Sequence, residues 1–204
     1  NPNHKLAYIA PTYRQGKAIA WDYLKQYTKP LMYLGGDKNE TELRVDLWNG
    51  SKIQIYGADN NDSLRGLGFH GVIMDEYAIM APRTWTEIVR PAISDTLGWV
   101  IFIGTPMGHN QFWEVYDYAL RGHKDWFGKL YRASETGVIP DDELEQAASI
   151  MTEEQYNQEF ECSFTAAVSG SYYGKLMTKA DNENRIGVVP VDSNVGVETW
   201  WDLG

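Results

Sequence analysis

The stretch Gly71-Val72-Ile73-Met74-Asp75-Glu76 decides how the rest of the chain is interpreted. Its apolar run predicts a buried central strand of an α/β sheet, and such sheets place ligands at the carboxyl ends of their strands. At that end, Asp75 could hold Mg²⁺ directly or through water, and Glu76 could deprotonate a water that attacks a γ-phosphate. The same pattern also fits a core strand that enters a solvated turn.

A second apolar run, Trp99-Val100-Ile101-Phe102-Ile103, ends in Gly104-Thr105-Pro106. The interval from Asp75 to Thr105 suits one βαβ crossover, which predicts that the two strands are parallel neighbours. Both strands would then end at the same sheet edge, so Thr105 could reach the water or phosphate handled by Glu76. Gly-Thr-Pro is also common turn chemistry.

The region before the acidic strand combines a strand and helix with a hairpin. Leu6–Ala10 is predicted to be a buried strand, and the helix after it carries an apolar stripe of Ile19, Tyr23 and Tyr27. Alternating apolar residues on both sides of Asn49-Gly50 predict an antiparallel hairpin, inserted before the acidic strand.

Turns and helix starts complete the expected order of elements. Pro30 is expected to end the first helix region, and Gly35–Asn39 to form a flexible loop. Further helices are predicted at residues 112–120, after Pro140 and after Thr152, where Gln155 completes a capping box.

Composition limits the class of protein. The chain has 204 residues, a net charge of −10, a hydrophobic content of 43% and one cysteine, Cys162, so we expect a soluble, intracellular globular protein without an internal disulfide. The negative charge is the wrong sign for a broad basic surface that coats nucleic acid, so any DNA contact must be local or outside this chain. Because the chain starts just before a strand and stops at Trp200–Gly204 in mid-element, we expect it to be part of a longer protein.

In their order and spacing, the motifs resemble the large terminase subunit of tailed bacteriophages, the ATP-driven motor and nuclease that packages DNA. The resemblance covers nearly the whole chain. It is carried by Ala10–Gln15, Ser63–Gly66, Val72–Glu76, Ile103–Pro106, Tyr156–Phe160 and Trp201–Gly204.

The resemblance implies an α/β fold of the P-loop NTPase type, additional-strand class. A mostly parallel sheet flanked by helices, with a β-hairpin insertion, would be followed by the first strands of an RNase H-like nuclease domain. Residues 1–168 would be the ATPase domain without its Walker A loop, 169–190 a linker, and 191–204 the start of the nuclease.

The resemblance also implies roles for single residues. Asp75 and Glu76 match the Walker B magnesium residue and the catalytic glutamate. Gly104-Thr105-Pro106 matches the motif that couples hydrolysis to movement, with Thr105 catalytic and Gly104, like Asp75, binding the nucleotide. Arg65 matches an arginine finger offered to a neighbouring subunit, although a plain surface arginine is the alternative. Asp202 matches the first metal-binding acid of the nuclease, although a turn residue is the alternative.

By the same resemblance, the cofactors are ATP and Mg²⁺, with Mg²⁺ or Mn²⁺ in the nuclease. The partners are double-stranded DNA, the portal protein, the small terminase subunit and other copies in a homo-oligomeric ring on the procapsid, in the host cytoplasm and without a membrane. The chain departs from the family in having no Gly-x-x-x-x-Gly-Lys-Ser/Thr loop, which is expected upstream of Asn1, so this stretch alone is expected to be inactive.

Two other classes of function remain open on the sequence. Another P-loop nucleic-acid motor, such as a helicase, could share the acidic strand. A non-enzymatic interaction module could use Trp85, Trp113 and Trp126 as binding anchors, although tryptophans at helical spacing are more often core residues.

Overall fold

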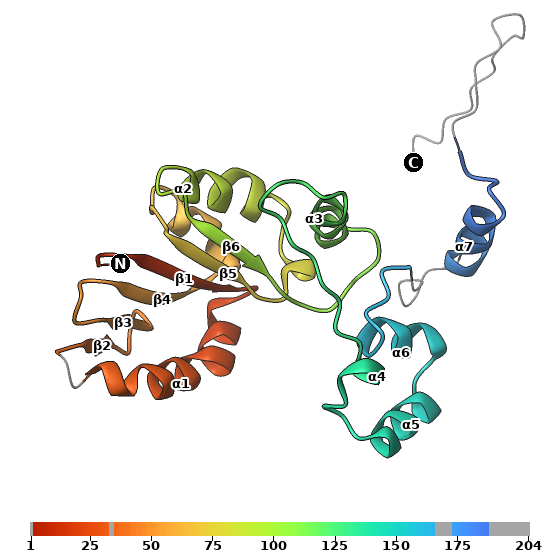
Figure 1. The fold of residues 1–204 in the computed structure, drawn as a ribbon, viewed down its shortest axis with the longest axis horizontal. Coiled ribbons are helices and arrows are strands. Elements are labelled where there is room, and N and C mark those ends of the chain that lie inside the picture. Colours follow the sequence, from red (N-terminus) through yellow and green to blue (C-terminus); the bar gives the residue numbers. More distant parts are fainter. Residues whose placement is uncertain (1, 33–34, 166–172, 188–204) are drawn as a thin grey trace, which may run out of the picture. The chain divides into compact units, whose positions relative to one another are not determined.

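The computed structural model describes residues 2–32, 35–165 and 173–187. The chain divides into two compact units, residues 1–166 and 167–204. The first unit contains a six-stranded sheet with its helices (Figure 1). In the second, helix α7 (Gly174–Asn182) lies within the range predicted as a linker.

The sheet is mixed and mostly parallel, as predicted. Its strands run in the order β2-β3-β4-β1-β5-β6. The four strands β4, β1, β5 and β6 pair in parallel, and β3 is antiparallel to both β2 and β4. The strands are β1 (Lys5–Ala10), β2 (Asp37–Asn39), β3 (Arg44–Asp46), β4 (Lys52–Gly57), β5 (Gly71–Met74) and β6 (Trp99–Phe102).

The predicted hairpin is present, but it extends the main sheet. β3 and β4 pair around Asn49-Gly50, and Gly50 has a φ of +79°, which a tight turn needs. β4 then pairs with β1 along six residues, so the hairpin is not a separate insertion. The predicted loop at Gly35–Asn39 is wrong in its last residues, because β2 pairs there with β3 as an edge strand.

The helices follow their start signals more closely than their stop signals. A capping box opens α6, as predicted, since Thr152 and Gln155 exchange side chain to backbone hydrogen bonds. Pro30 lies inside the last turn of α1 and does not end it. The α-helices of the first unit are α1 (Tyr13–Met32), α2 (Arg90–Ser94), α3 (Gln111–Leu120), α4 (Ala133–Thr136), α5 (Asp141–Ile150) and α6 (Glu153–Glu159).

Helix α1 buries a different face from the one predicted. The three residues of the predicted apolar stripe are exposed by 49%, 60% and 74%: Ile19, Tyr23 and Tyr27. The helix turns Gly16 and Trp21 to the sheet because the absence of a side chain at Gly16 allows a close approach. A Cβ there would lie 2.7 Å from Ile55. Trp21 fills the space beside it and is 2% exposed.

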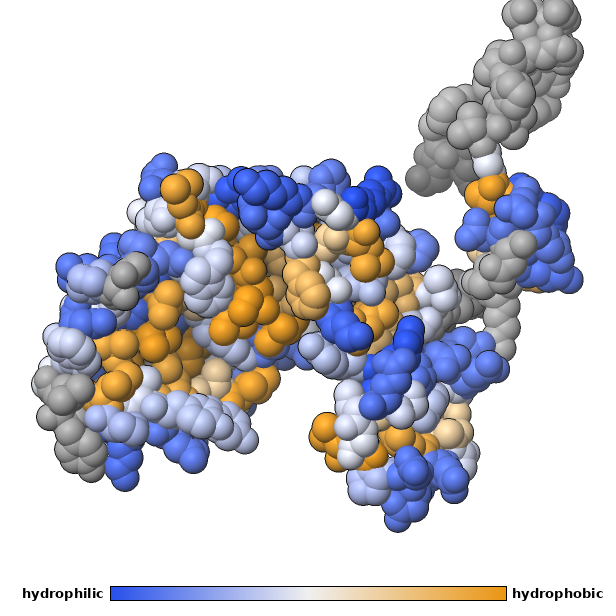
Figure 2. Space-filling view, in the orientation of Figure 1, coloured by the Kyte–Doolittle hydropathy of each residue, from blue (hydrophilic) through white to orange (hydrophobic). Residues whose placement is uncertain are grey.

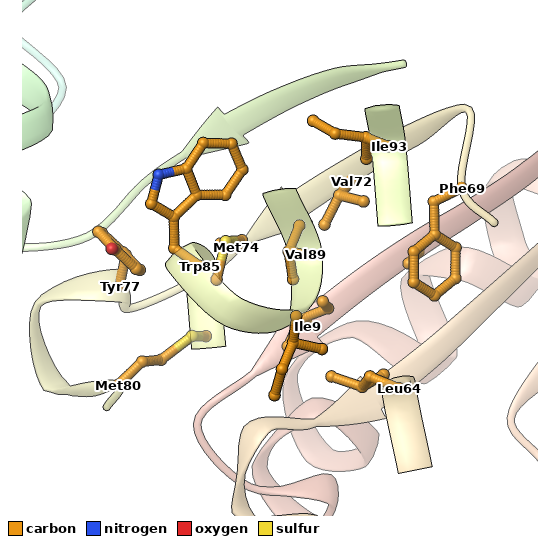
Figure 3. Close-up of a cluster of buried hydrophobic side chains, with 12 residues drawn as sticks. Ile9, Leu64, Phe69, Val72, Met74, Tyr77, Met80, Trp85, Val89 and Ile93 are labelled. Carbon is orange, nitrogen blue, oxygen red and sulfur yellow. The ribbon is translucent and has the colours of Figure 1, made fainter. Parts of the chain in front are cut away.

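The main core lies on the opposite face of the sheet, under a helical segment formed by a π-helical turn (Thr84–Val89) and α2. Figure 3 shows Ile9, Val72 and Met74 of the sheet pointing toward Trp85 and Val89 of this segment. The residues of β1, β5 and β6 alternate between this core and the other face, as expected for strands of period two.

The three tryptophans considered as binding anchors pack inside the first unit. Trp85 is 9% exposed, and its ring centroid is 4.9 Å from that of Phe102. Trp126 is stacked on the same phenylalanine, and Trp113 contacts Phe164 at 5.1 Å. The interaction-module alternative therefore loses its anchors.

Strand β6 is at the border of the sheet and keeps an exposed apolar face. Trp99, Ile101 and Ile103 are 49%, 46% and 42% exposed. Figure 2 shows apolar side chains gathered over this part of the sheet. Helix α1 contacts β1, β3 and β4 on the same face, so the apolar cover of the sheet is incomplete beside β6.

Candidate functional site

The acidic pair and the Gly-Thr-Pro segment emerge at the same edge of the sheet. β5 and β6 are parallel neighbours, and Met74 stands opposite Phe102, so Asp75 and Thr105 both follow the carboxyl ends of adjacent strands. This confirms the predicted crossover. The backbone amide of Thr105 donates a hydrogen bond to the carboxylate of Glu76. The contact between Thr105 and the acidic pair therefore runs through the main chain of Thr105.

Asp75 is fixed by hydrogen bonds from two neighbours. Its backbone N–H donates to Ile9 O in β1 at 2.8 Å. Its Oδ1 accepts from the backbone N–H of Glu76 at 3.1 Å, and its Oδ2 accepts from the hydroxyl of Tyr8. Burial, followed by this bond to Asp75, raises the pKa of Tyr8, so the phenol stays protonated as the donor.

Tyr8 is a site residue that the sequence did not reveal. In the sequence it is one more large residue in the apolar run of β1, and tyrosine is common in strands. Only the pairing of β1 with β5 brings its hydroxyl to Asp75. No local motif signals that contact.

Glu76 has a left-handed backbone conformation, with φ of 53° and ψ of 44°. Such a conformation costs a residue with a side chain of order 1–3 kcal/mol, and it persists only where the surroundings enforce it. Here the next amide, Tyr77 N, donates to Ile103 O at 3.1 Å and so ties the turn to the end of β6. Burial, followed by the charge of Asp75, raises the pKa of the Glu76 carboxyl, while the Thr105 amide lowers it.

Gly104 allows the end of β6 to pass directly over Glu76. A Cβ at Gly104 would lie 3.0 Å from Glu76 Cα and 3.3 Å from Tyr77 N. Its φ of +146° is also a conformation that residues with side chains rarely adopt. Glycine is therefore required both by space and by conformation, and it brings Thr105 within reach of Glu76.

The turn after the acidic pair is held by the start of α3. Gln111 Nε2 donates to the carbonyl oxygens of Met80 at 2.7 Å and of Tyr77 and Ala78 at 3.1 Å. Asn110 Nδ2 donates to Ala78 O at 2.9 Å. These two amides were also missed, because their partners are more than thirty residues earlier in the chain.

Arg65 lies away from the acidic pair. It follows a 3₁₀ segment (Ala58–Leu64), and its half-exposed guanidinium pairs with Asp62 at 3.1 Å and Glu87 at 3.6 Å. The nearby Arg83 pairs with the same two acids at 3.9 Å and 3.8 Å. The structure therefore does not join Arg65 to Asp75 and Glu76 within one chain. The predicted nuclease ligand, residue 202, lies outside the described residues.

The acidic pair suits a magnesium ion that arrives with phosphates. Mg²⁺ is usually bound by one or two carboxylates together with substrate phosphates and water. Asp75 and Glu76 provide two carboxylates at an open strand end, and Asp75 is already oriented. In the part of the chain that the structure describes, no group of three or more His, Cys, Asp or Glu residues could hold a metal by itself. The same described residues include no helix long and apolar enough to cross a membrane.

Comparison with known sequences finds phage relatives, although no family model matches the chain. The chain is 27% identical over 169 residues to the terminase large subunit of Escherichia phage T5, which covers 80% of this chain and 38% of that protein. A stretch of 72 residues is 40% identical to the terminase large subunit of Thermus phage G20c, which covers 35% of this chain and 15% of that protein. The chain thus spans less than half the length of these relatives.

Solved structures share the fold. The ATPase domain of the large terminase of Thermus phage P74-26 matches with a TM-score of 0.72 and 22% identity, over 80% of this chain and 78% of that one. The large terminase of a second thermophilic bacteriophage, in complex with ADP, matches with a TM-score of 0.64 and 15% identity, over 80% and 41%. In sequence and in fold, the chain is a relative of the large terminase subunits of bacteriophages, and it shares the fold of their ATPase domain.

Proposed function

We propose that this chain supplies the magnesium-binding and water-activating side of an ATPase site in a viral DNA-packaging motor. The observation that carries the proposal is the meeting of Asp75, Glu76 and Thr105 at the ends of two adjacent parallel strands. Phosphoryl transfer needs mainly positioning and charge stabilisation, and two carboxylates at such an edge can provide both. One of the phage terminases that share the fold was solved with ADP.

The two carboxylates have different surroundings, which suit different roles. Asp75 accepts two hydrogen bonds and is held in place, as a magnesium ligand should be. The pKa of Glu76 is raised by burial and by Asp75, which makes it a stronger base toward water. Magnesium, when bound with ATP, neutralises charge on the phosphates. Glu76 then orients the attacking water and takes its proton.

The segment after β6 is proposed to transmit hydrolysis to movement. Gly104 passes over the backbone of Glu76, and the Thr105 amide contacts the Glu76 carboxylate, so a change at the carboxylate reaches this segment directly. Gly104 also leaves room for the nucleotide to approach the main chain. Thr105 would therefore sense whether the γ-phosphate is present.

The phosphate-binding loop is proposed to join the sheet beside β6. The chain contains no Gly-x-x-x-x-Gly-Lys-Ser/Thr sequence. Exposed apolar strand edges are normally paired or covered, and β6 exposes Trp99, Ile101 and Ile103 next to the acidic pair. A strand paired with β6 would end at the same edge and would place a phosphate-binding loop opposite Asp75 and Glu76.

The remaining parts of the motor are proposals that rest on the relatives. Arg65, which is half-exposed and outside its own acidic site, would act on the nucleotide of a neighbouring subunit in a homo-oligomeric ring on the procapsid. Double-stranded DNA, the portal protein and the small terminase subunit are the proposed partners, in the host cytoplasm. The endonuclease activity, with Asp202 as a ligand of Mg²⁺ or Mn²⁺, is proposed for the RNase H-like domain that would begin at residue 191. The relatives do not favour a helicase.

Glu76→Gln in the full-length protein tests the proposal. The amide keeps the shape of the side chain but cannot take a proton, so ATP turnover should fall by about 10²–10⁴-fold while nucleotide is still bound. Phosphate release and nucleotide retention measure the two effects. Glu145→Gln, an exposed change on α5, is the control and should leave turnover unchanged.

The pH dependence gives a second measurement on the same site. Because the base must be ionised, turnover should be lost as the pH falls through the pKa of Glu76. That pKa is raised, so the acid limb should lie above the usual range of a glutamate. Normal turnover by Glu76→Gln would remove Glu76 from the mechanism and leave only the fold.

A further inference from the structure

The hydroxyl of Tyr8 has no role in the site as described so far. Tyr8 lies in the middle of β1, and its ring packs against the cluster under α1, which consists of Trp21, Leu43, Val45 and Ile55. A phenylalanine would fill this apolar space equally well. The hydroxyl, however, donates a hydrogen bond to Oδ2 of Asp75, 67 residues later in the chain.

The sheet register explains how Tyr8 reaches Asp75. Tyr8 stands opposite Ile73 in β5, and Asp75 follows Ile73 by two residues, so both side chains lie on the same face of the sheet. Diagonal neighbours of this kind are within reach of a long aromatic side chain. The backbone of Asp75 is held to β1 as well, through its N–H bond to Ile9 O. Strand β1 therefore fixes both the main chain and the side chain of Asp75.

The two hydrogen bonds to Asp75 leave it able to bind a metal. A carboxylate has about four lone-pair sites, two on each oxygen. The amide of Glu76 uses one on Oδ1 and the hydroxyl of Tyr8 uses one on Oδ2. Each oxygen keeps one site free, and the plane of the carboxylate can no longer rotate.

We propose that Tyr8 is a positioning residue of the magnesium site, because its hydroxyl holds Asp75 with the free lone pairs available to the ion. The inference rests on the proposed ATPase function. Hydrogen-bond partners of metal ligands typically change metal affinity or activity by about 10–100-fold when they are removed. The effect of Tyr8 should therefore appear in the requirement for magnesium, with little change in turnover once the metal is saturating.

Tyr8→Phe in the full-length protein is the test, and Tyr56→Phe is its matched control. Tyr56, in the neighbouring strand β4, is also partly buried, and its hydroxyl donates to Gln54 Oε1 at 2.9 Å, on the other face of the sheet. Tyr8→Phe should raise the magnesium concentration for half-maximal ATPase by about 10–100-fold. Mn²⁺ binding, measured by electron paramagnetic resonance with a non-hydrolysable ATP analogue, should weaken by a similar factor. Tyr56→Phe should change neither value.

A double-mutant cycle separates positioning from a general structural effect. If Tyr8 acts through Asp75, Tyr8→Phe should cost no further Mn²⁺ affinity in an Asp75→Asn background. An equal loss in both backgrounds would overturn the inference, as would a magnesium requirement equal to that of Tyr56→Phe. A wild-type protein without magnesium-dependent hydrolysis and without Mn²⁺ binding would instead refute the proposed function itself.

Discussion

Gly104→Ala is the change whose cost the structure defines most sharply. The new Cβ would lie 3.0 Å from Glu76 Cα, whereas carbon atoms prefer about 3.5–4.0 Å, and the obstructing atoms belong to the main chain. The φ of +146° adds a conformational cost of about 1–3 kcal/mol. Together we expect a loss of at least about 2 kcal/mol, which for a chain of this size lowers Tm by roughly 4–8 °C.

The same change should also alter the acid limb of hydrolysis. To relieve the overlap, the end of β6 must move away from Glu76, which weakens the bond from the Thr105 amide. That bond lowers the pKa of Glu76, so its loss should raise the pKa further and move the acid limb to higher pH.

Thermal unfolding and the pH profile of ATP turnover in the full-length protein measure these effects. Gly137→Ala is the control, because Gly137 has a φ of +62° but no atom within 4 Å of its added Cβ. It should lose only the conformational part, about 1–2 kcal/mol, with no change in the pH profile. If Gly104→Ala is no less stable than Gly137→Ala and keeps the wild-type acid limb, the close approach does not support the site.

Two further changes test the core and the proposed contact between subunits. Ile9→Ala, at a fully buried position, should cost about 2–5 kcal/mol in urea unfolding, whereas Ile19→Ala, at a position 49% exposed, should stay within about 0.5 kcal/mol; comparable losses would contradict the assigned face of α1. Arg65→Ala should abolish ATP turnover alone, and mixing it with Glu76→Gln subunits should restore part of it, since each variant supplies what its neighbour lacks. Unchanged turnover by Arg65→Ala would remove it as an arginine finger.

The elements that were predicted correctly are those with a strong local pattern. The apolar runs before Asp75 and Gly104 became β5 and β6, and alternation around Asn49-Gly50 became the β3–β4 hairpin. The capping box at Thr152 opens α6. Each pattern lies within a few residues, where backbone preference and burial of one face act together.

The errors lie where local patterns allow more than one outcome. A helix with large apolar residues on two sides can bury either, and Gly16, which approaches Ile55 closely, decides in favour of the Trp21 side. The short edge strand β2 has a polar sequence, Asp37-Lys38-Asn39, so only its pairing with β3 makes it a strand.

The sequence by itself determined that an acidic strand and a Gly-Thr-Pro strand end at one edge of an α/β sheet, because a crossover of that length forces parallel neighbours. Only the tertiary structure decided how the carboxylates are held. The bond from Tyr8 to Asp75 and the passage of Gly104 over Glu76 depend on strand register and on backbone approach at the ångström scale. Those quantities arise from packing distant segments together, and no residue pattern within a single segment encodes them.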